Sequence, residues 1–288
     1  MRAWVLVPFL TAFLGLFAAP LASETTMDAP PAGIEQMHRE MLFTVALIRT
    51  GRGSGSGTII YSAERNGEWA TYALTNYHVI ASAIRRQTIC CDDEGEKYDV
   101  ERRSPVDVLF FEYNDLSRPI GTRGKRATIE AFDQLADVAL LRLSDREGGV
   151  EFVATMHDPD VPLYMFEQVW AVGAGLGEPP FATTGLLSRV DREIDGFSYI
   201  ASSSPIIYGS SGGALFRHRA DGSDTGTFQI VGITSIARAA GWQLVEHINF
   251  SIPMATVWRF LRANCFGFLV GDTTEHLGCG GHTIEGAE

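Results

Sequence analysis

The chain has 288 residues, of which 45% are hydrophobic, and it is large enough to bury a substantial core. Its formal net charge of −12 at pH 7 argues against a nucleic-acid partner, because no basic stripe is available to neutralise phosphates. Thirty glycines and many short apolar runs between polar turns favour an all-β protein.

The first 23 residues have the pattern of a signal peptide. Arg2 supplies a positive charge, residues 3–19 are nearly all apolar, and the small residues Ala22 and Ser23 precede a polar stretch. We therefore expect an exported protein, periplasmic or secreted. The alternative is an uncleaved anchor, because the apolar run is near the lower limit for a spanning helix; only then do we expect membrane contact.

The next part of the chain, residues 24–40, is predicted to contain a short helix at 33–39. Residues 41–150 are then predicted to form a first domain, and the basic cluster from Arg118 to Arg126 is predicted to be a solvated turn. The apolar runs of this domain predict strands at 41–48, 57–61, 69–77, 106–113, 127–132 and 138–143.

A second domain is predicted over residues 151–262, and the connector between the two domains is predicted at 144–162, across their boundary. His157 in the connector and His218 in a charged loop are expected to face solvent. A helix at 254–262 closes this domain, and residues 263–288 form a tail. The strands predicted here lie at 168–174, 182–190, 197–202, 213–216, 228–235 and 247–252.

Three short motifs supply a base, a carboxylate and a hydroxyl nucleophile in the order His78, Asp137, Ser211. A serine hydroxyl needs an adjacent imidazole to take its proton, and the imidazole needs a buried carboxylate to fix its tautomer. Asp137 opens a buried apolar strand, whereas its nearest rival, Asp133, lies before that strand. Ser211 lies among glycines, so the N–H groups of Gly209 and Ser211 are the natural oxyanion donors.

These motifs resemble those of the chymotrypsin-like serine proteases. The matching sequences are Leu-Thr-x-x-His at 74–78, Asp-Val-Ala-Leu-Leu at 137–141 and Gly-x-Ser-Gly-Gly at 209–213. The sequences at 53–60, 169–175 and 248–254 are most similar to the HtrA/Deg-type bacterial branch, and the resemblance covers residues 40–262.

The resemblance implies a fold, an activity and a substrate class. The fold is two packed antiparallel six-stranded β-barrels with a short C-terminal helix and the active site between the barrels. The activity is hydrolysis of peptide bonds in protein or peptide substrates, without a cofactor or metal. Ser235 matches the family serine beside the catalytic carboxylate.

Two departures from the family pattern have consequences. Ser210 stands where digestive-type members carry the aspartate that pairs with a newly cut N-terminal ammonium, so we expect no activation by that route. HtrA-type proteins usually continue into PDZ domains, whereas only about 26 residues of this sequence follow Arg262. We therefore expect a protease domain without a PDZ domain.

The family also places the specificity pocket. Its floor, six residues before the nucleophile, corresponds to Pro205, and one wall follows Ser235 with Ile236 and Ala237. The opposite wall is expected near residues 248–249. Because this floor carries no negative charge, we expect a preference for small to medium aliphatic residues before the scissile bond.

Two other functions fit parts of the sequence. Gly209–Gly213 also satisfies the Gly-x-Ser-x-Gly elbow of α/β-hydrolase esterases, but that fold orders its triad serine, acid, histidine and needs alternating strands and long helices. A catalytically degenerate protease used as a binding module is the other alternative. Such proteins usually lose a triad member, and this chain has all three.

The four cysteines indicate disulfides in an exported chain. Cys265 and Cys279 are the candidate pair, while the adjacent Cys90 and Cys91 are not expected to bridge each other. Cys265 and Cys279 together with His276 and His282 also offer four zinc-ligand types. Their spacing matches no well-known zinc finger, so the disulfide is favoured over a metal site.

Overall fold

The computed structural model describes residues 33–65, 67–90, 97–144, 148–220, 226–235 and 248–272. All of them belong to one compact unit that spans residues 32–288. The signal-peptide or anchor prediction falls outside the described residues. Within the described ranges, no helix is long and apolar enough to cross a membrane.

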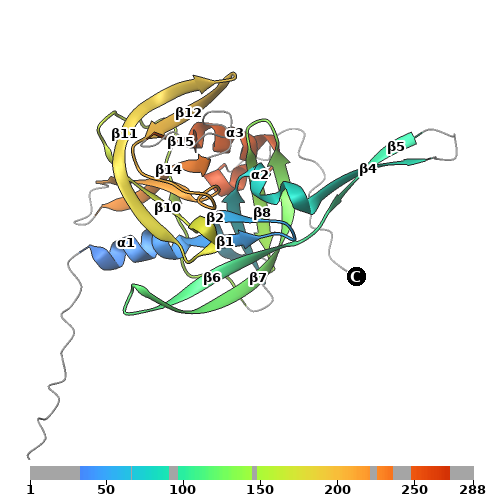
Figure 1. The fold of residues 1–288 in the computed structure, drawn as a ribbon, viewed down its shortest axis with the longest axis horizontal. Coiled ribbons are helices and arrows are strands. Elements are labelled where there is room, and N and C mark those ends of the chain that lie inside the picture. The colour runs from blue at the N-terminus through green and yellow to red at the C-terminus, as the bar shows by residue number, and fades with distance from the viewer. Residues whose placement is uncertain are drawn as a thin grey trace, which may run out of the picture. The chain divides into compact units, whose positions relative to one another are not determined.

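The first half of the chain forms a closed antiparallel barrel (Figure 1). Its strands follow the order β1-β2-β3-β8-β7-β6, and β1 closes the ring by pairing with β6 through Leu47 and Leu109. The strands are β1 (Val45–Arg49), β2 (Ser54–Arg65), β3 (Glu68–Thr75), β6 (Val106–Asn114), β7 (Arg118–Asp133) and β8 (Val138–Leu143).

Strand β8 is apolar at every position except Arg142 and does not alternate with polar residues. Leu141 and Leu143 belong to the core inside the first barrel. Val138 and Leu140 belong to a second cluster that also contains Phe216 of the other half. Because successive strand residues face opposite sides, a strand buried on both faces needs apolar residues at nearly every position.

The second half forms another ring of six antiparallel strands. They follow the order β13-β10-β11-β12-β15-β14, and pairing of β13 with β14 closes the ring. A two-residue strand, β9 (Thr155–Met156), adds to β14 in parallel. The six are β10 (Gln168–Gly173), β11 (Phe181–Ile194), β12 (Phe197–Ser202), β13 (Ala214–Arg219), β14 (Thr227–Ser235) and β15 (Asn249–Pro253). The predicted fold of two antiparallel six-stranded barrels is confirmed.

Helices lie at the ends and joints of these barrels. Helix α1 (Ile34–Glu40) docks on the second barrel, where Glu40 Oε2 accepts a hydrogen bond of 2.8 Å from Phe228 N. Helix α3 (Met254–Ala263) buries the predicted apolar side, Val257, Phe260 and Leu261. The other helical turns are α2 (Tyr77–Ile80), η1 (Leu42–Thr44), η2 (Ala81–Ala83), η3 (Gly175–Gly177) and η4 (Gly267–Val270).

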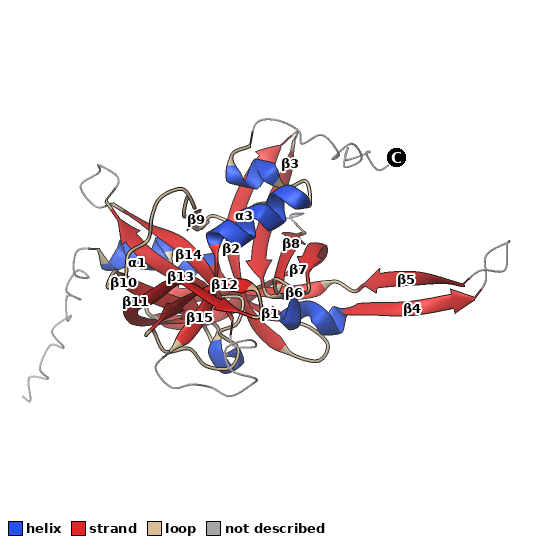
Figure 2. Ribbon diagram, turned by 90° about the horizontal axis from the view of Figure 1, so that it is seen from above, coloured by secondary structure: helices blue, strands red, loops and turns tan. Residues whose placement is uncertain are grey.

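A two-stranded hairpin, β4 (Ile84–Cys90) and β5 (Lys97–Arg103), was not expected from the sequence. It starts directly after α2 and η2 and extends away from both barrels (Figure 2). It forms a sheet of its own, and neither strand pairs with any other described strand. Its polar sequence gave no apolar period because the side chains described on it are mostly exposed.

Two predictions were wrong. The basic cluster from Arg118 to Arg126 is the first part of strand β7, not a turn, and it pairs with β6 as an exposed ribbon. His157 is 2% exposed instead of facing solvent. Its Nε2 lies 3.0 Å from Val161 O, and its Nδ1 lies 3.4 Å from an Arg217 nitrogen, so its polar atoms are satisfied inside the protein.

Candidate active site

The three triad candidates come from three different joints of the fold. His78 lies on α2, which follows β3, and Asp137 immediately precedes β8. Strands β3 and β8 pair side by side, with Thr75 opposite Ala139, so the two residues start from neighbouring strand ends. Ser211 lies on the segment between β12 and β13 of the second barrel.

The structure brings His78 and Asp137 into direct contact. His78 Nδ1 lies 2.9 Å from Asp137 Oδ2 and 3.0 Å from Oδ1. The backbone N–H of His78 also donates to Oδ1 at 3.0 Å, and Ser235 Oγ donates to Oδ2 at 2.9 Å. A carboxylate only accepts hydrogen bonds, so these contacts keep the proton on Nδ1 and leave Nε2 facing away from the carboxylate.

Asp137 holds this position through an uncommon backbone conformation. It is 3% exposed, and its φ of 59° lies in the left-handed region that residues with a side chain rarely adopt. The side-chain amide of Asn76, itself fully buried, donates to the Asp137 carbonyl at 2.9 Å. This bond holds the backbone so that the carboxylate meets both the ring and the N–H of His78.

The Ser211 segment lies against the first barrel beside α2. Ser56 N on β2 donates to Ser211 O at 2.7 Å. A methyl group added to Gly55 would lie 2.6 Å from Val79 Cγ2 and 3.1 Å from Ser211 O. Because Gly55 has no side chain, Val79 and the backbone of Ser211 can both lie close to this position of β2.

The end of β14 connects the carboxylate to the nucleophile segment. Ser235 contacts Asp137, and its neighbour Thr234 donates through Oγ1 to Ser210 O at 2.6 Å. Thr234 also forms backbone bonds with both glycines that follow Ser211, Gly212 N to Thr234 O and Thr234 N to Gly213 O. The two barrels therefore hold the three triad candidates in one hydrogen-bonded network.

Residues 207–210 form a tight turn that fixes the peptide orientation at Gly209. Ser210 N donates to Ile207 O at 2.9 Å, and Gly209 has φ 92°, as required at the third residue of a type II turn. The Tyr208 carbonyl accepts a 2.7 Å bond from Leu176 N. Because the peptide is planar and trans, the Gly209 N–H points the opposite way, away from Leu176.

The peptide before Ser211 is also held in a fixed orientation. The Ser210 carbonyl accepts bonds from Thr234 Oγ1 and from Gly213 N, so the Ser211 N–H points away from them. Ser210 is only 4% exposed, and its own Oγ accepts a 3.2 Å bond from Ile207 N. The turn is thus closed from within by a serine at the position of the digestive-type aspartate.

The residues predicted to form the specificity pocket are described only in part. Pro205 is exposed, and its carbonyl accepts a hydrogen bond from Thr183 Oγ1. Asn249 is 7% exposed, and its side-chain amide donates to Ser204 O. Ile236 and Ala237, the predicted wall, lie outside the described residues.

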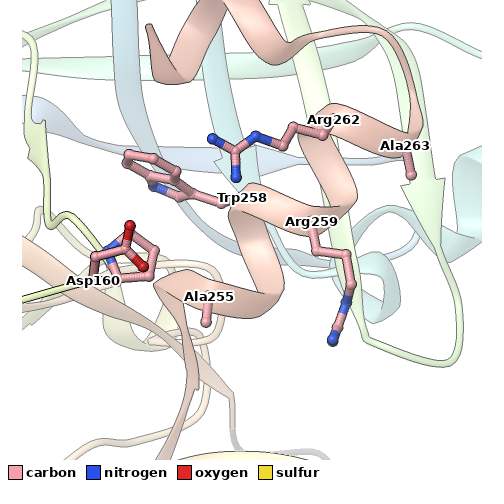
Figure 3. A pocket seen from close by; sticks show the side chains of 7 residues that line it. Asp160, Ala255, Trp258, Arg259, Arg262 and Ala263 are labelled. Carbon is pink, nitrogen blue, oxygen red and sulfur yellow. The ribbon is translucent and has the colours of Figure 1, made fainter. Parts of the chain in front are cut away.

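A surface hollow of about 570 Å³ lies elsewhere, on α3 (Figure 3). Arg262 stacks on Trp258 at 5.1 Å and forms an ion pair with Asp272, which raises the pKa of the arginine. None of the residues that line this hollow belongs to the segments that carry the triad candidates. The hollow is lined by Pro159, Asp160, Ala255, Trp258, Arg259, Arg262 and Ala263.

Asp133 and His218, a further carboxylate and histidine that the sequence offered, do not take part in the contact between His78 and Asp137. Asp133 Oδ1 accepts bonds of 2.8 Å from Leu135 N and Ala136 N, which caps the turn before Asp137. His218 is exposed, as expected, although it lies on strand β13 and not in a loop.

The predicted disulfide between Cys265 and Cys279 can be checked at Cys265 alone. Cys265 takes part in a disulfide bond, and the side chains of Cys90, Cys91 and Cys279 lie outside the described part of the chain. The zinc alternative includes His276 and His282, which also lie outside it. Among the residues that are described, no group of three or more His, Cys, Asp or Glu could hold a metal ion.

Three residues of the site were not identified from the sequence. Ser56 Oγ donates to Gly209 O and accepts from Ala174 N, both at 2.7 Å, so it connects β2 to the Gly209 turn. Asn76 supports Asp137, and Leu176 orients the Tyr208 peptide. Ser56 and Asn76 lie inside motifs that carry the family resemblance, which was the available signal, but Leu176 acts through its backbone N–H and leaves no sequence signal.

Comparisons with known proteins agree with the two-barrel fold. The chain matches the trypsin-like peptidase domain family over residues 55–223, more than half of its length. No curated protein matches it. The structure is similar to the serine endoprotease from Yersinia pestis, with 20% identity, a TM-score of 0.52, and 85% of this chain and 69% of that chain covered.

A second similar structure is Deg5, with 22% identity, a TM-score of 0.52, and 79% of this chain and 90% of that chain covered. At these identities the likeness concerns the fold, which is the one expected for the HtrA/Deg branch. The chain belongs to the trypsin-like peptidase family and is a serine endopeptidase with the chymotrypsin-like two-barrel fold.

Proposed function

We propose that the protein is an exported serine endopeptidase that cleaves peptide bonds through an acyl-enzyme, with Ser211 as nucleophile, His78 as general base and acid, and Asp137 as the orienting carboxylate. Ser211 Oγ attacks the scissile carbonyl while His78 Nε2 takes its proton. The same imidazole then passes this proton to the leaving amine. Water repeats the sequence and releases the acid product.

The contact between Asp137 and His78 Nδ1 is the observation that carries this proposal. The carboxylate is 3% exposed and accepts bonds from the His78 ring, the His78 backbone and Ser235. A buried carboxylate so bonded stabilises the imidazolium that forms when serine loses its proton. A histidine with a purely structural role at a strand end has no need of this arrangement.

The second part of the proposal assigns the oxyanion hole to the N–H groups of Gly209 and Ser211. Support comes from the carbonyls of Tyr208 and Ser210, which are each bonded on the side away from these N–H groups. Donors that are fixed before the reaction stabilise developing charge without reorganisation. The substrate is thus polarised by backbone groups, and no step needs a cofactor.

A fluorophosphonate probe tests the nucleophile directly. We expect the wild-type protein to be labelled on Ser211, as located by mass spectrometry of the labelled peptide. Ser211→Ala should not be labelled, and Ser203→Ala, a change at a nearby serine of the same barrel, should be labelled like wild type. Absence of labelling in the wild type would favour the alternative of a degenerate, binding-only protease fold.

The specificity prediction follows from the pocket floor. Pro205 and its neighbours from 203 to 210 include no acidic residue, so a buried lysine or arginine would cost several kcal/mol without a partner. An apolar side chain instead gains about 25 cal/mol for each Å² of apolar surface removed from water. Profiling on a proteome-derived peptide library should therefore show valine, alanine or leucine before the scissile bond. Dominant cleavage after lysine or arginine would refute this pocket and leave the triad proposal intact.

The export proposal is supported by the signal-like sequence at 1–23 and by the disulfide at Cys265, since disulfides persist in oxidising compartments. We propose Cys279 as the partner of Cys265 because the two bracket a short glycine-containing loop. Peptide mapping of the unreduced protein tests this pairing.

A further inference from the structure

The hairpin β4–β5 carries arginines on both of its faces, and the two faces differ in how these charges are matched. Side chains directly opposite each other in an antiparallel pair share a face. Arg86 is opposite Glu101, and Ile84 is opposite Arg103, so these residues share one face. Arg85 is opposite Arg102, and this pair lies on the other face.

The arginines of the first face are paired within the protein. Glu101 accepts bonds from Arg86 Nε at 3.1 Å and from Arg103 Nε at 2.9 Å. Burial acts to raise the pKa of Glu101, but its bonds to Arg103 and Arg86 outweigh this and lower it. Arg103 also donates to the carbonyls of Ile129 and Glu130 and stacks over Phe132 at 4.9 Å. This face therefore packs back toward β7.

The other face keeps its charges exposed. Arg85 and Arg102 are both exposed, and neither forms an ion pair with any residue that the structure describes. Like charges directly opposite each other on a ladder are destabilising, because the Cβ atoms lie only about 5 Å apart. A pair of arginines in this arrangement is suited to an anionic ligand that neutralises both, and the guanidinium fork matches a carboxylate.

The position of the pair connects it to the active site. Arg85 follows His78 after only the short helical turns α2 and η2, so it lies on the order of 15 Å from His78. Figures 1 and 2 show the hairpin starting beside α2. An extended peptide advances about 3.3 Å per residue, so a substrate bound at Ser211 that runs toward the hairpin would reach the pair about five residues from its scissile bond.

We propose that Arg85 and Arg102 form a substrate-binding exosite that selects polypeptides with an acidic segment about five residues from the cleaved bond. This rests on the proposed protease function and adds a substrate class to it. Two arginines are too few for the phosphates of a nucleic acid or for an anionic membrane, which is bound by clusters of about four to eight basic residues. They match two or three carboxylates of a peptide.

The test uses peptides with valine before the scissile bond and a run of either glutamate or glutamine about five residues away, on each side in turn. We expect the wild type to cleave one glutamate peptide roughly fivefold faster in kcat/KM than its glutamine counterpart, since each exposed ion pair contributes modestly. In R85Q/R102Q this ratio should fall to about one, and in R85E/R102E below one. The preference should shrink at high salt.

The matched control is R118Q/R192Q, which removes two arginines that are also exposed and without a described ion pair, on β7 and β11. It should keep the wild-type preference. Equal cleavage of the two peptides by the wild type, or a preference that survives R85Q/R102Q, would overturn the exosite.

A binding experiment separates the exosite from catalysis. Fluorescence anisotropy of the labelled glutamate peptide should show binding to Ser211→Ala that is weakened by R85Q/R102Q. If the wild type cleaved no peptide but this arginine-dependent binding held, the exosite would stand and the proposed enzyme activity would fail. Arginine-dependent binding to phosphatidylglycerol vesicles without peptide binding, or an arginine-dependent dimer in light scattering, would overturn the proposal in favour of a lipid or a second copy.

Discussion

Asp137 and Gly209 both hold left-handed backbone conformations, with φ of 59° and 92°, at the two places where the site needs an exact direction. For Asp137 the conformation turns the carboxylate toward the backbone N–H and the ring Nδ1 of His78, and Asn76 supports it. For Gly209 it sets the plane of the peptide whose N–H is the proposed oxyanion donor. Backbone strain of this kind persists only where the surroundings over-determine it.

The Gly209 peptide can be tested with a single methyl group. A Cβ at Gly209 would lie 2.8 Å from Leu176 N and 2.9 Å from Ala174 O, so Gly209→Ala must shift the turn that orients the N–H. We expect kcat/KM to fall by about 10² to 10³, the usual cost of losing one oxyanion donor.

Gly196→Ala is the matched control for this change. Gly196 has a similar φ of 79° but nothing within 4 Å of its Cβ position, so it tests backbone strain without contact to the site. It should lose some stability and keep its turnover. If Gly209→Ala also kept wild-type kcat/KM, the oxyanion assignment would be wrong.

At the scale of elements, the sequence predicted those strands whose buried side chains give the sequence a recognisable apolar pattern. The bounds of β8 and β12 agree with the prediction, because both strands are mostly buried and are followed by turn residues. The hairpin β4–β5 and the first part of β7 were missed because most of their described side chains are exposed and their sequences have no apolar period.

The candidate active site also contains residues that the sequence predicted and residues that it did not. The triad candidates lie in local motifs that a sequence displays, and the structure places His78 against Asp137. Ser56 and Leu176 act on the Gly209 turn, about 150 and 30 residues away along the chain, through contacts that exist only after the barrels pack. Ser56 lies inside a motif of the family resemblance, but its contact with the turn, like the backbone contact of Leu176, depends on tertiary structure and cannot be identified from a local pattern.

The connector after β9 contains a buried histidine that makes stability depend on pH. Burial, together with the charge of Arg217, lowers the pKa of His157. Since the ring donates from Nε2 to Val161 O, its Nδ1 accepts from Arg217, and the ring is neutral in the folded protein. Glu167 pairs with Arg217 on its other side, at 2.9 Å.

The lowered pKa of His157 makes the folded protein less stable at acidic pH. Below the unfolded pKa of about 6.5, unfolded chains bind a proton that the folded protein does not, so the free energy of unfolding falls as pH drops, by at most about 1.4 kcal/mol per unit. Urea unfolding at about pH 7.5 and 5.5 should show a smaller loss in His157→Gln than in wild type. His218→Gln, at an exposed position, should lose as much as wild type; equal losses in all three proteins would contradict this role of His157.

At the scale of the whole molecule, the described contacts of both barrels hold the Gly209 turn in place. Ser56 of the first barrel bonds to Gly209 of the second, and Ser210 closes its own turn through Ile207. Digestive-type members instead complete the oxyanion hole with an ammonium created by proteolysis. The described contacts give this protein no role for such a group.

We therefore predict that protein beginning at Glu24 is active without any further cut. A short tag added to that N-terminus should leave kcat/KM within about twofold of the untagged protein, because no buried N-terminal ion pair is lost. Activity assays and mass spectrometry of the intact chain test this together. Activity that arose only after cleavage at one internal site would show an activation segment.

The central claim is that Ser211 and His78 act as one catalytic unit, and a double-mutant cycle on kcat/KM tests it most directly. Ser211→Ala and His78→Ala should each lower turnover by about 10⁴ or more, and the double variant should be less than about tenfold worse than either, because removing one member already disables the other. Circular dichroism would confirm that each variant folds. Near-wild-type hydrolysis by Ser211→Ala, or losses that multiply in the double variant, would contradict the account.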